Sequence, residues 1–418
     1  MCEDKAIIVE TPEIQTDLLS EVIRRGARDL LAMAVEAEVS EFLSMHQRSM
    51  ADGKNQYVRN GYLPERGIQT GIGEVKVTVP RVRDREKIKS DIQFHSSIVP
   101  SYLRRSVKMQ EFLPLLYLKG ISTGDFREAL SPLMGDSARN LSAGVISRLK
   151  ERWEEEFAQW SVRSLAGDHY VYWWADGIYF QARMEEAKDC VLVIMGVTVD
   201  GTKELIAISD GYRESKDSWT DVLRSLQRRG LKKAAKLAVG DGALGFWGAL
   251  NEVYPETRHQ RCWVHKISNV LNYLPKNMHA QAKNDLEQIW MAETRAKARR
   301  AWIEFIEKYR FKYPKAVGCI EKNEEELLAF YDFPAEHWKS LRTTNPIEST
   351  FATVRHRTKK SKGCFSRETI LAMVFKLCSS AEKRWRRIPG FKRLEEVIEG
   401  IKFIDGIAEN QKTLKIAA

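Results

Sequence analysis

The sequence has few cysteines, and none of them forms a close pair. Six cysteines are scattered over 418 residues without a CxxC motif, at positions 2, 190, 262, 319, 364 and 378. Isolated cysteines fit a reducing compartment better than a disulfide framework. We therefore expect an intracellular protein that folds without disulfides.

The sequence also shows no long apolar run and no visible export signal. No stretch approaches the roughly 20 apolar residues of a membrane span. The first residues, "MCEDKAIIVETPE", carry acids where a signal peptide carries bases. There is no internal repeat and no low-complexity tract. These absences predict a cytoplasmic protein that does not associate with membranes.

The composition is that of a globular protein with an excess of positive charge. A hydrophobic content of 43% over 418 residues allows a large core and roughly two to four domains. The 67 basic residues outnumber the 57 acidic ones, which gives a net charge of +10. This balance favours a polyanionic partner without identifying it.

The first 165 residues read as helices with a small β-ribbon. Residues 16–43 predict an amphipathic helix capped by Thr16 or Asp17, with apolar positions at helical spacing: Leu19, Val22, Ile23, Leu30, Ala34 and Ala37. Residues 67–86 alternate valines with polar residues, and we expect Pro80 to end this ribbon before the basic tail "PRVRDR". Helices predicted at 122–135, where Ser122 and Asp125 have capping-box spacing, and at 141–160 fit either a helix-turn-helix or a helical bundle.

The middle of the chain predicts a mixed sheet. Three strand-like runs from His169 to Gly211 precede alternating helices and strands, in the order βββαβαβ. This order indicates an antiparallel start and a parallel continuation, with helices on the faces, so the fold class is α/β within a mixed α+β chain. From about residue 271 to 341 the pattern is helical, and two further helices joined by a basic loop around Gly363 follow.

A carboxylate interrupts the apolar strand "VYWWADGIYF", where Asp176 follows two tryptophans and an alanine. Burying an unpaired carboxylate costs several kcal/mol, so such an acid usually has a cation beside it. Alternatively, Asp176-Gly177 starts a hairpin turn, since Asp-Gly is a common turn dipeptide. From this stretch alone, both interpretations remain open.

Two more acids stand at positions suited to chemistry. Asp241 follows the apolar run "KLAVG", and residues at the carboxyl ends of strands line the ligand crevice of open α/β sheets. Glu348 lies in "TTNPIESTF", where Asn345 as N-cap and Pro346 as first helical residue would also give it a capping-box role. Capping and an inward-facing side chain are compatible.

Two further motifs accompany these acids. Cys262 and His265 in "RCWVH" are spaced like metal ligands near the end of the last strand, but with His259 they make only three candidates for zinc, so a structural or site-supporting pair is the better interpretation. After Glu348 comes a basic run without acids, which is either a solvated face or a path for a phosphate backbone: Arg355, Arg357, Lys359, Lys360, Lys362 and Arg367.

The chain resembles bacterial members of the Mutator-like transposase superfamily, which are DDE recombinases. The resemblance runs over nearly the whole chain, through "RNGYLPER", "VKVTVPRVRDR", "YLKGIST", "VYWWADGIYF", "AVGDGALGF", "RCWVHK", "RTTNPIESTF" and "AEKRW". The later motifs are the specific ones. "TTNPIE" before a basic helix, downstream of "GDGA" and CxxH, is hard to assemble by chance.

This resemblance implies a domain plan. It predicts an N-terminal DNA-binding region at 1–165 and a ribonuclease H-like catalytic domain formed by 166–272 and 341–400. A helical insertion at 273–340 would interrupt that domain, and a C-terminal tail would occupy 401–418. Arg81 and Arg83, in the "PRVRDR" segment, are expected to contact DNA phosphates.

The resemblance also implies a reaction. Asp176, Asp241 and Glu348 would be the catalytic triad and hold Mg²⁺, for which Mn²⁺ can substitute; carboxylate oxygens suit such hard ions. Two ions about 3.5–4 Å apart can assist both the attacking and the leaving oxygen. The enzyme would bind the inverted repeats of its element, free 3′-hydroxyls and join them to target DNA, acting as a homo-oligomer, expected to be a dimer on DNA, in the nucleoid. A related nuclease or resolvase and a non-catalytic DNA-binding repressor are the alternatives.

Overall fold

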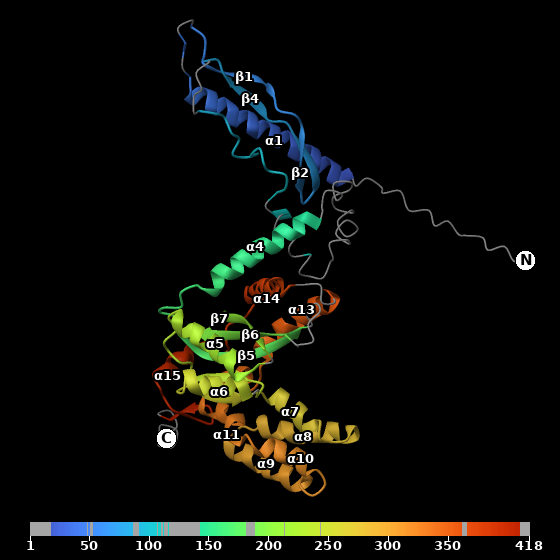
Figure 1. Ribbon diagram of the computed structural model, residues 1–418, viewed down its shortest axis with the longest axis vertical. Helices are drawn as coiled ribbons and strands as arrows, with labels where there is room; N and C mark the ends of the chain where they lie inside the picture. The colour runs from blue at the N-terminus through green and yellow to red at the C-terminus, as the bar shows by residue number, and fades with distance from the viewer. Residues whose placement is uncertain are drawn as a thin grey trace, which may run out of the picture. The chain divides into compact units, whose positions relative to one another are not determined.

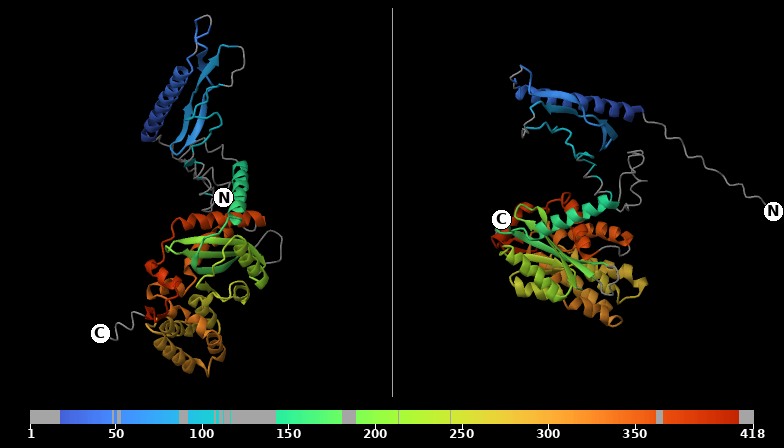
Figure 2. Two further views of the ribbon diagram at one scale, coloured as in Figure 1. Left: turned by 90° about the vertical axis from the view of Figure 1, so that its left-hand side faces the viewer. Right: turned by 45° about the horizontal axis from the view of Figure 1, so that its top comes forward.

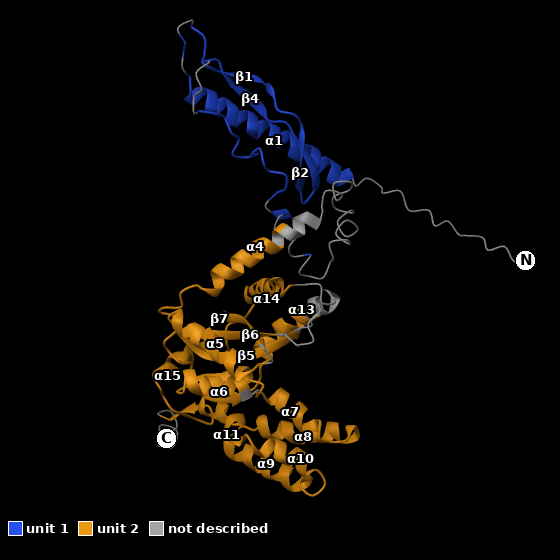
Figure 3. Ribbon diagram, viewed as in Figure 1, with its two compact units in different colours: residues 1–147 blue, residues 148–418 orange. Residues whose placement is uncertain are grey.

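The computed structural model describes residues 18–409, except 48, 51–52, 87–91, 107, 110–111, 113–115, 117–142, 181–188, 213, 243 and 362–365. The chain divides into two compact units, residues 1–147 and 148–418 (Figure 3). None of the described helices combines the length and apolar composition required to cross a bilayer. The helix expected at 122–135 lies outside the described residues, so the helix-turn-helix and the bundle both remain predictions.

The first unit packs a long helix against short antiparallel strands (Figure 1). Its elements are α1 (Leu18–Met45), β1 (Tyr57–Tyr62), β2 (Arg66–Thr70), β3 (Gly73–Val77) and β4 (Pro80–Asp84). β1 pairs with β4 and β2 pairs with β3. Their shared core is built almost entirely from β-branched residues, which suit a pleated surface: Val35, Ile68, Val75, Val77, Val79 and Val99.

Two expectations for this unit are wrong. Pro80 does not end the ribbon but begins β4, and the expected basic tail is a strand paired with β1. Proline is tolerated at the first position of a strand because its missing N–H costs little there. The α1 positions predicted to face a core are also misplaced, because Leu19, Val22 and Leu30 are exposed, while Val35 and Val39 are buried.

The second unit is built on one mixed sheet of five strands in the order β7-β6-β5-β8-β9. β5 (Tyr170–Phe180), β6 (Asp189–Thr198) and β7 (Lys203–Tyr212) pair antiparallel, whereas β8 (Leu237–Gly240) runs parallel to β5 and β9 (Arg258–Arg261) runs parallel to β8. The predicted order of strands and the change from antiparallel to parallel pairing are confirmed. In this arrangement the ends of β5, β7 and β8 meet at one edge of the sheet.

Helices cover both faces of this sheet (Figure 1, Figure 2). α5 (Lys216–Arg228) and α6 (Leu244–Val253) pack on one face, around Trp173 and Leu192. α13 (Asn345–Ser361) and α14 (Arg367–Glu382) pack on the other face, against β5 and β7. α4 (Ala143–Ser161) packs its Phe157 and Trp160 rings against Phe375 of α14.

A helical segment connects β9 to α13. It comprises α7 (Trp263–Leu271), η2 (Lys276–Met278), α8 (His279–Trp290), α9 (Arg295–Tyr309), α10 (Pro314–Glu321), α11 (Glu324–Leu327), η3 (Ala329–Asp332), η4 (Ala335–His337) and α12 (Trp338–Leu341). Its end is tied to the sheet, since the Trp174 indole donates to the Ser340 carbonyl at 3.1 Å. The chain continues with η5 (Phe391–Arg393), α15 (Leu394–Ile398), β10 (Phe403–Ile404) and β11 (Ile407–Ala408).

Candidate active site

Asp176 and Asp241 come together at the edge of the sheet. β5 and β8 pair in parallel with Trp174 opposite Val239, and continuing this register by two residues sets Asp176 beside Asp241. Asp176 and Gly177 both pair with β6, opposite Val193 and Leu192, so the Asp-Gly dipeptide lies inside a strand. The turn interpretation of this dipeptide is therefore wrong.

The carboxylate of Asp176 is buried with incomplete hydrogen bonding. Asp176 is 6% exposed, and its Oδ1 accepts the N–H of Gly177 at 2.8 Å. Its Oδ2 has no hydrogen-bond partner among the described residues. Burial and, next, the Asp241 carboxylate raise the pKa of Asp176 to about 7. Such a group destabilises the fold when it is ionised, unless a cation lies beside it.

Glu348 is held by neighbours rather than by a capping box. α13 begins at Asn345, one residue earlier than predicted, so Glu348 is the fourth helical residue. The Thr344 hydroxyl donates to Oε1 of Glu348, and His265 Nδ1 lies 3.5 Å from the same oxygen. The N–H of Thr344 donates to the Cys262 sulfur at 3.3 Å instead of to the Glu348 carboxylate.

The CxxH pair lies at the start of a helix, not on the last strand as expected. β9 ends at Arg261, Cys262 is the N-cap of α7, and His265 is in its first turn. This N-terminal position brings ligand atoms of Cys262, His265 and Glu348 within 4.8 Å of one another. His259 is not in this group, because its ring packs on Trp247 at a centroid distance of 4.6 Å.

The surroundings of His265 favour the protonated form of its imidazole. A hydrogen bond to Cys262, followed by the charges of Cys262, Glu348 and Asp241, raises its pKa to about 9 although burial opposes this. His265 is also among the groups that lower the pKa of Asp176. His265 therefore interacts electrostatically with Asp176 and Asp241 as well as with Glu348 on α13.

The sequence prediction did not include a fourth acid, Glu214. It follows the strand "KELIAISDGY" and precedes α5, so it lies at the same sheet edge. Glu214 is 8% exposed, and burial together with the Asp241 carboxylate raises its pKa to about 6. Its place directly after a predicted strand was the available signal, since Asp241 was identified by the same criterion.

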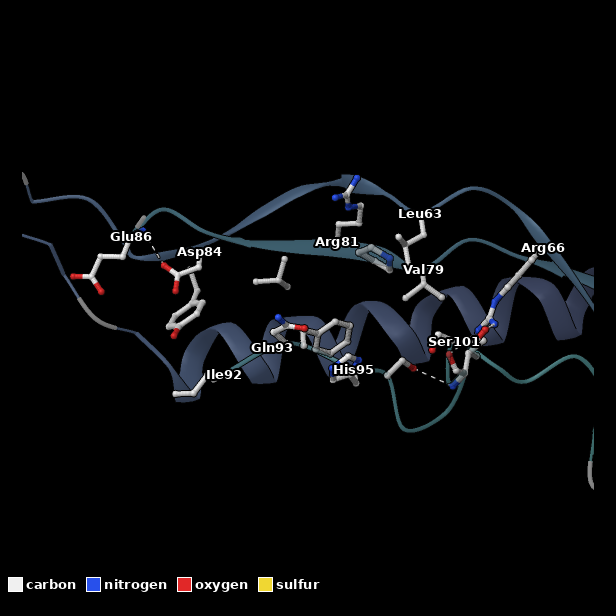
Figure 4. Close-up of a pocket in the computed structure, with 16 residues that line it drawn as sticks. Leu63, Arg66, Val79, Arg81, Asp84, Glu86, Ile92, Gln93, His95 and Ser101 are labelled. Atoms are coloured by element: carbon white, nitrogen blue, oxygen red, sulfur yellow. Dashed lines mark hydrogen bonds between the residues drawn. The ribbon is translucent and has the colours of Figure 1, made fainter. Parts of the chain in front are cut away.

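The two arginines expected to bind DNA in the first unit are exposed on β4. Arg81 and Arg83 alternate with more buried neighbours, and Figure 4 shows Arg81 extending to the side of the strand away from α1. β4 also borders a cavity of about 520 Å³ that residues 92–101 help to line (Figure 4). Arg81 and Arg83 are thus accessible to a partner.

The basic run after Glu348 is only partly described. Arg355 is exposed on α13, whereas Arg367 forms an ion pair with Asp210 at 3.2 Å. Arg357, Lys359 and Lys360 belong to α13, but their side chains are not among those described, and Lys362 lies outside the described residues. The continuous basic path therefore remains a prediction.

Comparisons with known proteins agree over most of the chain. Residues 4–388 match the family model "Transposase, Mutator family". The transposase for insertion sequence element IST2 of Acidithiobacillus ferrooxidans is 53% identical over 68% of this chain and 96% of its own length. The transposase for IS6120 of Mycolicibacterium smegmatis is 52% identical over 67% and 86%.

A solved structure, the simian T-cell lymphotropic virus intasome with the PP2A regulatory subunit B56 gamma, contains a chain with a weaker likeness. The TM-score is 0.16 at 12% identity, over 52% of this chain and 65% of that one. A likeness of this size supports no conclusion about the fold.

Proposed function

We propose that this chain, which belongs to the Mutator family of transposases and specifically to those of insertion sequences, transposes its element by phosphodiester hydrolysis and strand transfer. The reaction takes place at the edge of the five-stranded sheet where Asp176 of β5 and Asp241, directly after β8, lie side by side. The protein binds the terminal inverted repeats, exposes 3′-hydroxyls and joins them to target DNA. The observation that carries this proposal is the parallel register of β5 and β8, which brings Asp176 beside Asp241, together with His265, which interacts with both aspartates and lies 3.5 Å from Glu348 on α13. The order β7-β6-β5-β8-β9 supports a ribonuclease H-like catalytic domain.

The residues at this edge fit divalent metal ions. Asp176 has a buried oxygen without a hydrogen-bond partner among the described residues, and Asp241 lies beside it. Hard carboxylate oxygens of this kind are the ligands that Mg²⁺ and Mn²⁺ prefer. When bound, two such ions would supply charge stabilisation for the attacking and leaving oxygens of the phosphodiester.

The neighbours of Glu348 fix its carboxylate for that role. Thr344 donates to Oε1, and the protonated imidazole of His265 lies 3.5 Å from the same oxygen. The second oxygen of the carboxylate is not used by either group, so it is available to a metal ion. His265 and Thr344 are thus positioning residues, and Cys262 orients Thr344 through its sulfur.

DNA binding is assigned to basic residues, because phosphate contacts supply most of the affinity of proteins for DNA. Arg81 and Arg83 on β4 would hold phosphates in the N-terminal region, residues 1–165. The α13 segment with Arg355, Arg357, Lys359 and Lys360, followed by Lys362, starts about two helical turns after Glu348 and would follow the backbone near the scissile phosphate.

The test is an assay with labelled element ends, a target plasmid and Mg²⁺ or Mn²⁺. Transposition by this route produces metal-dependent nicks at the repeat ends, followed by joined products. Nicks without joined products would indicate a nuclease or resolvase. Binding of the repeats without metal-dependent nicks would overturn the catalytic assignment and leave a DNA-binding repressor.

A further inference from the structure

The carboxylate of Glu214 lies directly against strand β5 at Gly177. A Cβ atom added to Gly177 would lie 2.3 Å from Oε1 of Glu214 and 2.8 Å from the Cys190 sulfur. A side chain at this position would displace the Glu214 carboxylate, so glycine leaves the room that this carboxylate occupies beside the strand. Gly177 is the residue after Asp176, and its open side is the face covered by α5 and α6.

The backbone of Glu214 is also held in an unusual conformation. Its φ is +50°, in the left-handed region that side-chain-bearing residues rarely adopt. A Cβ on Gly245 of α6 would lie 2.2 Å from the Glu214 carbonyl oxygen. Glycines at these two positions, one on β5 and one on α6, thus leave the space that Glu214 occupies.

The buried acids Glu214 and Asp176 have few partners among the described residues. The Tyr179 hydroxyl donates to the Glu214 carboxylate, and among the described residues no lysine or arginine forms an ion pair with Glu214 or Asp176. Independently of Glu214, the buried Asp176 has an oxygen without a hydrogen-bond partner in the described part of the chain. Such an oxygen can accept a hydrogen bond or coordinate a cation.

Asp241 connects the two buried acids. After burial itself, the Asp241 carboxylate is the largest influence on the pKa of both Asp176 and Glu214. All three acids therefore share one electrostatic environment at the sheet edge. A cation placed there would interact favourably with each of them.

We propose that Glu214 is a fourth carboxylate of the divalent-ion site, a positioning residue that supplies negative charge beside an ion held by Asp176 and Asp241 and accepts hydrogen bonds from the waters of that ion. This inference rests on the proposed function, because it assumes a metal ion at this edge. Groups of this kind, which support the direct ligands of a metal, typically change metal affinity by about 10–100-fold.

The test measures Mn²⁺ binding to the full-length protein by titration calorimetry, with no DNA present. Glu214→Gln keeps the shape of the side chain and its bond to Tyr179 but removes the charge. We expect Mn²⁺ affinity to fall by about tenfold or more. Nicking of repeat ends should require correspondingly more Mn²⁺.

A matched control is available at the other end of the same sheet. Glu204 on β7 accepts the Tyr170 hydroxyl at 2.9 Å, as Glu214 accepts that of Tyr179. Glu204→Gln should bind Mn²⁺ as the wild-type protein does. If Glu214→Gln also does so, the inference is overturned.

Two further variants distinguish a failure of the Glu214 inference from a failure of the proposed function. Gly177→Ala leaves Glu214 in the chain but displaces its carboxylate, so it should weaken Mn²⁺ binding in the same direction even if Glu214→Gln folds poorly. Asp241→Asn tests the proposed function itself. Unchanged metal binding and nicking in Asp241→Asn would refute the metal site, whereas loss in Asp241→Asn alone would refute only the role of Glu214.

Discussion

The two units place their functional charges in opposite surroundings. At the sheet edge of the second unit the charges are negative and buried, with Asp176 at 6% and Glu214 at 8% exposure. On β4 of the first unit they are positive, and Arg81 and Arg83 are exposed. A buried charge lowers the stability of the fold unless a partner offsets it, so it occupies a specific position. An exposed charge has little effect on stability, and several exposed charges contribute independently of one another. Under the proposed function, this contrast separates the residues for chemistry from the residues for binding.

The largest effect is expected at the buried edge. Replacing Asp176 or Asp241 by Asn, or Glu348 by Gln, should reduce nicking by at least about 100-fold, because even residues behind a metal ligand are worth 10–100-fold. Binding to repeat DNA should persist, since phosphate contacts rather than metal ligands supply it. Glu252→Gln, which removes an exposed acid paired with Lys216 and Arg224, is the control.

A nicking assay and a gel-shift titration on the same preparations measure both properties. If Glu348→Gln cleaved at the wild-type rate, Glu348 would serve only to start α13. If a variant lost cleavage and binding together, the replaced acid would also contribute to DNA binding, and chemistry and binding would not be assigned to separate residues.

The acids of this edge were predictable from sequence to differing degrees. Asp176 and Asp241 were found because an acid in or after an apolar run is unusual, and the βββαβαβ order places both at one edge. Glu348 needed the family resemblance, since its local pattern fits a helix start equally well. Glu214 was missed because nothing in "GYRESKD" shows that Gly177, 37 residues earlier, leaves room for its side chain.

The fold could be predicted from sequence where the hydrophobic periodicity was strong. It could not be predicted where pairing between distant strands determined the structure. The five-stranded sheet followed from long apolar runs. In the first unit, β1 lies in a polar stretch and is stabilised mainly by its ladder to β4, which local sequence does not reveal. The exposed positions of α1 are as apolar as the buried ones, so its buried face could not be chosen from sequence.

A smaller effect is expected for the residues that hold Glu348. His265→Asn removes the positive charge 3.5 Å from Oε1 of Glu348, and Thr344→Val removes the hydroxyl that donates to this oxygen. Each should lower kcat for nicking by about 10–100-fold with little change in KM for DNA. His279→Asn is the control, because that ring bonds only to the Leu274 carbonyl in the described structure. An increase in KM alone would place His265 in DNA binding instead.

A still smaller and more uniform effect is expected on β4. Replacing Arg81 and Arg83 together by Ala should weaken binding to repeat and scrambled DNA alike, and reduce the slope of log K against log salt by up to about 0.9 per lost phosphate contact. Arg59→Ala is the matched control on the neighbouring strand, where the guanidinium bonds to Glu36 and Tyr62. A loss confined to repeat DNA would instead mean that these arginines read sequence.

The smallest effect concerns stability and returns to the buried edge. The pKa of Asp176 in the folded protein is about 7, against an ordinary value of 3.8. A carboxyl whose pKa is raised by folding stabilises the fold fully below its unfolded pKa and loses this contribution as pH rises through the folded value. In the presence of a chelator, the Tm of the wild-type protein should therefore fall between about pH 4 and pH 7.

His265, with a pKa of about 9, adds a fall in the same direction at higher pH, so the variant must be compared with wild type at each pH. Asp176→Asn cannot ionise, so its Tm should lie above that of the wild type at pH 8. The difference should shrink toward pH 4, and each kcal/mol corresponds to about 2–4 °C in a unit of this size. Excess Mg²⁺ should raise the wild-type Tm at pH 8 but not that of the variant, because the ion stabilises the ionised carboxylate. Parallel Tm curves for the two proteins from pH 4 to pH 8 would show that Asp176 is ionised without cost, and the contrast between the buried and the exposed charges would then fail at its central residue.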